Sequence, residues 1–94
     1  MATVDLLYAA TQLVTEARLA SPSMIQRNVL NKHGVRITFS TANQLLAQMR
    51  HSGIIGPARE GSRPSDVLME WEQAREALAA EHGGSYDPSH HATA

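Results

Sequence analysis

The sequence contains no cysteine, which excludes disulfide bridges and thiolate metal sites. No apolar run approaches the roughly 18–20 residues that a membrane-spanning helix needs. Its first residues lack a basic stretch followed by an apolar one, so we expect no secretory signal. The 94 residues, 43% of them apolar, suffice for one small domain with a core. These features favour a cytoplasmic, soluble protein.

Patterns that carry catalysis or bind metals are also missing. His33 and His51 lie far apart and have no carboxylate at ligand spacing, and no His-Glu-x-x-His pattern occurs. Nothing marks a nucleophile turn or a catalytic triad. The pair His90–His91 is expected to be solvated in the tail. The sequence therefore predicts no enzymatic activity, no metal and no cofactor.

The net charge of −1 conceals an uneven distribution. Residues 1–64 hold seven Lys and Arg against three Asp and Glu, a balance of +4. Residues 65–94 hold one Arg against six acidic residues, a balance of −5. Because phosphate affinity depends on where cations lie, this split favours a nucleic-acid partner, although chance also produces such differences in short chains.

Two helices are expected in the first third of the chain. The first runs from Val4 to about Leu19, with apolar residues at three- and four-residue steps. Ser21 and Pro22 are typical of a helix start, as cap and first helical residue, and Gly34 is typical of a helix end. A short extended segment, residues 35–38, follows.

A third helix is expected to begin at a cap on Thr38 or Ser40 and to end near Ser52 and Gly53. Its buried stripe comprises Ala42, Leu45, Leu46 and Met49. Its opposite face is uncharged and polar, and comprises Ser40, Asn43, Gln44, Ala47, Gln48 and His51. A helix that enters a DNA groove has such a face, but so does many an ordinary exposed helix.

The remainder predicts a hairpin and a fourth helix. Residues 54–55 and 67–69 suit two short strands, and the turn-rich loop between them has Arg59 and Arg63 at its tip. A helix from about Glu70 to Glu81 follows, with acidic residues around an apolar face.

This order of elements predicts a mainly α winged helix-turn-helix: a three-helix core, a small β-hairpin wing and an added C-terminal helix. We expect a winged-helix domain at residues 1–69, an acidic helix at 70–82 and a disordered tail at 83–94.

Two blocks of sequence carry a family resemblance. They are Ser21-x-Ser23-x-x-Gln26-Arg27 and Gly53-Ile54-Ile55-Gly56-Pro57…Gly61-Ser62-Arg63-Pro64-x-x-Val67-Leu68. Residues 5–69 resemble the gamma domain of the FtsK/SpoIIIE DNA translocases. The resemblance implies a winged helix that reads short, G-rich sites on chromosomal DNA and contacts a recombinase.

The sequence departs from that family at the third helix. The segment between Arg27 and Phe39 is longer, and Ser40, Thr41 and Gln44 stand where the family places an Asn and arginines. The resemblance therefore supports DNA binding by this chain more strongly than it supports recognition of the family's own DNA sequence. The expected DNA contacts are Gln26, Arg27, Arg36, Ser40, Thr41, Asn43, Gln44, Arg59 and Arg63.

Within this set, the four arginines are expected on phosphates, whereas Asn43 and Gln44 suit an adenine edge. The function predicted is sequence-specific binding of double-stranded DNA by a nucleoid-associated regulator or site-marking protein. The alternative is a winged-helix protein-interaction module without DNA binding. Trp71 packs either within the monomer or at an interface, which leaves open a dimer through the last helix.

Overall fold

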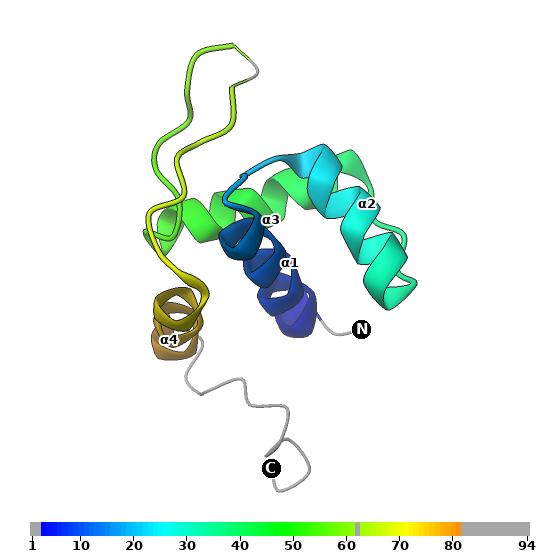
Figure 1. Ribbon diagram of the computed structural model, residues 1–94, viewed down its shortest axis with the longest axis horizontal. Helices are drawn as coiled ribbons and strands as arrows, with labels where there is room; N and C mark the ends of the chain where they lie inside the picture. Colours follow the sequence, from blue (N-terminus) through cyan, green and yellow to red (C-terminus); the bar gives the residue numbers. More distant parts are fainter. Residues whose placement is uncertain (1–2, 62, 82–94) are drawn as a thin grey trace, which may run out of the picture.

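The computed structural model describes residues 3–61 and 63–81. This part of the chain folds into four helices (Figure 1): α1 (Thr3–Ala17), α2 (Pro22–His33), α3 (Phe39–His51) and α4 (Trp71–Glu81). Helix α1 contacts each of the other three, and α2 also packs on α3. All four helices expected from the sequence are confirmed, so the fold is a compact all-α arrangement.

The helix ends follow from capping residues. The Ser21 side chain accepts from the Met24 N–H at the start of α2, and Gly34 ends it with φ +67° and an N–H bond to the Leu30 carbonyl. Helix α1 stops two residues earlier than expected because Arg18 adopts a left-handed conformation, φ +56°.

One continuous core joins all four helices. Its fully buried large side chains include Leu7, Val14, Ile25, Val29, Leu45, Met49, Ile54 and Leu78. Half-buried Trp71 meets Tyr8 edge-on, with 6.5 Å between ring centroids. Trp71 therefore packs within the chain, one of the two placements expected for it, and α4 belongs to the common core.

The hairpin is far smaller than expected. Where two strands were predicted, only an isolated antiparallel bridge joins Ile55 to Val67, and the described residues contain no longer strand. The Gly56 N–H donates to the Asp66 carbonyl (2.8 Å) and the Leu68 N–H donates to the Ile54 carbonyl (2.9 Å).

Pairing stops there because prolines stand on both sides of the loop. Pro57 and Pro64 have no N–H to donate to a ladder. A second bridge joins Ser65 to Ala20, between α1 and α2, so one side of the loop is tied to the helices instead. The described parts of the loop of residues 57–65, which are residues 57–61 and 63–65, extend beyond the helical body (Figure 1).

No helix among the described residues combines the length and the apolar character required to cross a membrane. The expected disorder of residues 83–94 and the pair His90–His91 lie outside the described part of the chain. The division into units at residues 1–69 and 70–82 stays a prediction.

Candidate nucleic-acid interface

Helix α3 presents the outward face that its sequence predicts. Ala42, Leu45, Leu46 and Met49 point into the core. On the opposite side Ser40, Asn43, Gln44, Ala47 and His51 are exposed and Gln48 is half-buried. Helix α4 packs on α1, and at the end of α3 its Glu81 pairs with His51 (Nε2 to Oε1, 3.0 Å). The first three turns of this face are therefore open to a ligand.

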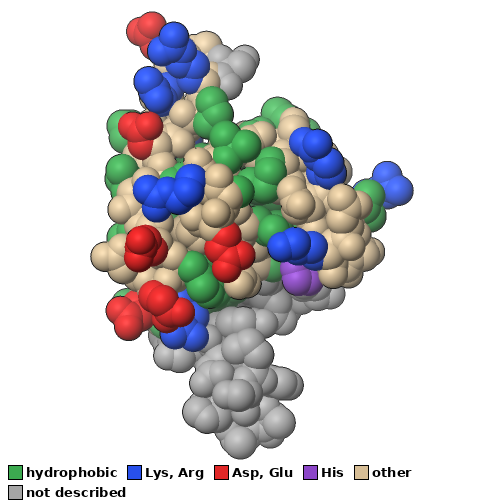
Figure 2. All heavy atoms as spheres, in the orientation of Figure 1, with side chains coloured by type: hydrophobic (Ala, Val, Ile, Leu, Met, Phe, Trp, Pro, Cys, Tyr) green, Lys and Arg blue, Asp and Glu red, His purple; other side chains and the backbone are tan. Residues whose placement is uncertain are grey.

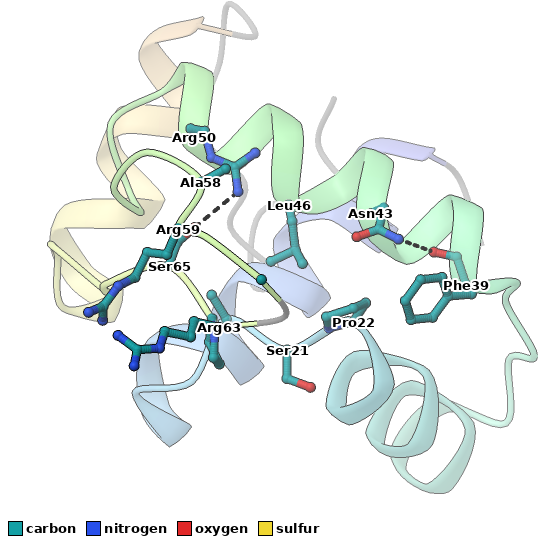
Figure 3. A pocket seen from close by; sticks show the side chains of 13 residues that line it. Ser21, Pro22, Phe39, Asn43, Leu46, Arg50, Ala58, Arg59, Arg63 and Ser65 are labelled. Atoms are coloured by element: carbon teal, nitrogen blue, oxygen red, sulfur yellow. Dashed lines mark hydrogen bonds between the residues drawn. The ribbon is translucent and has the colours of Figure 1, made fainter.

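A hollow of about 280 Å³ lies beside this face (Figure 3). Helix α3 contributes Phe39, Asn43 and Arg50 to its wall. The start of α2 contributes Ser21 and Pro22, and the loop of residues 57–65 contributes Arg59 and Arg63. Three segments that are distant in sequence thus converge on one concave surface.

Arg50 fixes the base of the loop to α3. Its Nε donates to the buried Gly56 carbonyl (3.1 Å), and its Nη2 donates to the Ser65 hydroxyl (3.1 Å). Because Gly56 and Ser65 stand on opposite sides of the loop, one half-buried guanidinium holds both. In the sequence Arg50 is only one of the seven positive charges of residues 1–64, because nothing in its local sequence indicates this contact.

The loop arginines are exposed and suited to phosphate contacts. Arg59 makes a 3.4 Å ion pair with Asp66, and such surface pairs contribute little and are readily exchanged. Figure 3 shows the Arg59 and Arg63 side chains leaving the loop in a similar direction. In Figure 2, Lys and Arg side chains lie at the protruding end of the molecule, where an acidic side chain accompanies them, and on its right and left sides, whereas Asp and Glu extend along the left edge toward the lower left.

The other expected contact residues are placed differently. Gln26 is half-buried and its Nε2 donates to the Ile37 carbonyl (3.2 Å), which ties α2 to the segment before α3. Thr41 is half-buried and its Oγ1 accepts from the Thr38 hydroxyl (3.0 Å). Arg27 and Arg36 are exposed, on α2 and on the α2–α3 connection, and are not among the residues that line the hollow.

Phe39 is a site residue that the sequence analysis missed. It is the first residue of α3, the residue is 54% exposed, and it lines the hollow beside Pro22 (Figure 3). The signal was present in the sequence, because Phe39 falls outside the predicted buried stripe of Ala42, Leu45, Leu46 and Met49. Because Phe39 also lines the hollow, it is a candidate for contact with a ligand.

Within residues 3–61 and 63–81, no three His, Asp or Glu side chains are grouped as metal ligands would be. The residues that line the hollow include hydrogen-bond donors such as Asn43, the cations Arg59 and Arg63, and the aromatic ring of Phe39.

Comparisons with known proteins identify the relatives of this chain. The Ftsk gamma domain model matches residues 2–70. A protein named DNA translocase FtsK from Streptomyces coelicolor is 35% identical over 82 residues, which cover 87% of this chain and 8% of that protein. The protein of the same name from Mycobacterium tuberculosis is 34% identical over 80 residues, 85% of this chain and 9% of the relative. The one from Oceanobacillus iheyensis is 42% identical over 65 residues, covering 69% and 7%.

This chain thus spans less than a tenth of the length of these curated relatives. The comparison with solved structures found no match. Because the family model covers residues 2–70 and these relatives exceed 30% identity, the chain belongs to the FtsK gamma domain family.

Proposed function

We propose that this chain binds double-stranded DNA as a winged helix, with α3 in the major groove and the loop of residues 57–65 on the flanking backbone. The observation that carries the proposal is the hollow that Asn43 of α3 lines together with Arg59 and Arg63 of the loop. A recognition helix and a wing lie side by side in this way when both touch one duplex.

The charges and the family support this reading. The balance of +4 over residues 1–64 favours a polyanionic partner, and the relatives are named DNA translocases. Binding of this kind occupies or marks sites on DNA, the role of a small regulator or a site-marking protein. The likeness to the family does not distinguish between these two roles.

The nine expected contact residues divide by chemistry. Arg27, Arg36, Arg59 and Arg63 bind phosphates and set the orientation of the protein. The residues that face the bases are Ser40, Thr41, Asn43 and Gln44. Gln26 acts through the segment before α3, whose Ile37 carbonyl it binds.

The test is a fluorescence-anisotropy titration of a labelled duplex of random sequence at several salt concentrations. Each phosphate-binding arginine contributes about one unit to the slope of log affinity against log salt. Arg59→Ala, Arg63→Ala and Arg27→Ala are therefore each expected to lower the slope by about one.

Arg75→Ala is the matched control, because Arg75 lies on α4 and pairs with Glu72 (2.7 Å). It removes the same charge and leaves the slope unchanged. An unchanged slope in a loop or α2 variant removes that arginine from the interface. If micromolar protein fails to bind any duplex at low salt, the proposed function is wrong.

A second candidate function is a protein interaction through α4, which the exposed acidic side chains of Glu72 and Glu76 favour. Negative charge on this side repels DNA and leaves the helix to a second copy or to another protein. Light scattering across a concentration series measures self-association. A dimer that binds no duplex supports this alternative.

A further inference from the structure

The readout face of α3 is its outward side, and none of its residues is a Lys or Arg: they are Ser40, Asn43, Gln44, Ala47, Gln48 and His51. Between Phe39 and Met49 the helix has no Lys or Arg, and Arg50 is bonded to Gly56 and Ser65 at the base of the loop. Arg and Lys are the usual readers of the O6 and N7 acceptors of guanine. This face is therefore poorly equipped to recognise guanine.

Two exposed amides occupy the centre of the face instead. Asn43 donates one Nδ2 proton to the Phe39 carbonyl (3.2 Å), which orients the amide and leaves its second proton and its Oδ1 for a base. Gln44, the next residue, is also exposed. An amide that donates to N7 and accepts from the N6 amino group is the usual reader of adenine.

Apolar groups flank these amides. Phe39, which is 54% exposed as a residue, lies one turn before Asn43, and exposed Ala47 lies one turn after it. Phe and Ala are residues that contact the C5-methyl group of thymine in the major groove. The face thus combines readers of both members of an A·T pair.

We propose that α3 selects A·T pairs: Asn43 and Gln44 read adenine, and Phe39 contacts a thymine methyl group. This inference rests on the proposed function, because it requires α3 to enter the major groove. Four helical residues span about 6 Å, or roughly two base-pair steps of about 3.4 Å, so Phe39 and Asn43 reach base pairs that lie up to two steps apart. The preferred site therefore contains adenine and thymine within two steps.

The first experiment is selection of duplexes from a random pool by the full 94-residue chain, followed by sequencing. We expect enrichment of adenine and thymine within two base-pair steps of each other, and loss of the adenine preference in Asn43→Ala. Replacing that adenine in the selected duplex is expected to weaken binding by roughly five- to 150-fold. Melting curves confirm that each variant is folded at the assay temperature.

The second experiment isolates Phe39. Replacing the contacted thymine of the selected duplex by deoxyuridine removes only the methyl group. The unsubstituted protein is expected to lose about fourfold in affinity, because one buried methyl contributes about that factor. Phe39→Ala is expected to bind both duplexes equally. An equal loss in both proteins overturns the role of Phe39.

The third experiment introduces a guanine reader. Gln44→Arg is expected to shift the selected sequences toward guanine. Gln12→Arg, on an exposed position of α1, is the matched control and is expected to retain the A·T preference. If both variants shift equally, the added charge rather than the face determines the preference, and the inference is wrong.

The outcomes separate the two proposals. If the selected duplexes are rich in guanine, or are bound without any sequence preference, A·T selection is overturned and DNA binding stands. Failure to retain any duplex at low salt removes DNA binding itself.

Discussion

At the scale of single residues, two positions with positive φ show how backbone conformation affects stability. Gly34 ends α2 at φ +67°, and a Cβ added there would meet nothing within 4 Å. Gly34→Ala is therefore expected to lower the free energy of unfolding by about 1–2 kcal/mol, through backbone strain alone. Arg18→Gly, at φ +56°, is expected to change it in the opposite direction. Urea denaturation measures the free energy of unfolding of both variants. A lower value in Arg18→Gly, as in Gly34→Ala, would contradict the left-handed conformation of Arg18.

Arg50 links a single side chain to the position of a whole loop. Arg50→Ala leaves the Gly56 carbonyl buried without this donor, which is expected to lower the free energy of unfolding by about 1–3 kcal/mol. It also frees the loop, so the Gly56 amide should exchange its hydrogen faster. Arg50→Lys should restore the stability only in part, because an ammonium lacks the planar geometry of guanidinium. Arg27→Ala is the exposed control, and an equal effect there would argue against the role of Arg50.

At the scale of elements, the structure shows which of two candidate residues, Thr38 or Ser40, caps the start of α3. Thr38 accepts from the Thr41 N–H (3.0 Å), so Thr38 is the cap and Ser40 lies inside the helix. Thr38→Ala is expected to lower the free energy of unfolding by about 1 kcal/mol, whereas Ser40→Ala has little effect. Thermal unfolding of the two variants checks this. The reverse order of stabilities would place the cap at Ser40.

How well an element could be predicted depended on how local its determinants are. The sequence predicted all four helices because caps and apolar spacing act within a few residues, as at Ser21 and Gly34. The hairpin was overestimated because β-branched residues such as Ile55 also suit a buried loop base. The loop is held in place by the hydrogen bond from Arg50 to Ser65 and by the bridge from Ser65 to Ala20, which are both contacts between residues distant in sequence.

At the scale of the whole molecule, the candidate site is a product of tertiary packing. The outward face of α3 followed from its helical period, so exposed Asn43 and Gln44 could be predicted. Their position beside the loop arginines could not, because no local pattern sets the direction in which the loop leaves the core. The placement of α4 on α1, with Glu81 at its end beside His51 of α3, also depends on packing in the common core, which no local pattern sets.

Because α4 shares a core with α1, we expect α4 to unfold together with the other three helices. Leu78 is fully buried, so Leu78→Ala is expected to lower the free energy of unfolding by about 2–5 kcal/mol. In a domain of this size each kcal/mol corresponds to about 4–8 °C in Tm. Exposed Glu76→Ala, on the same helix, should stay within about 0.5 kcal/mol. Calorimetry tests this: a single transition shifted to lower temperature in Leu78→Ala means that all four helices unfold together. If α4 folded independently of residues 1–69, Leu78→Ala would leave the main transition unchanged.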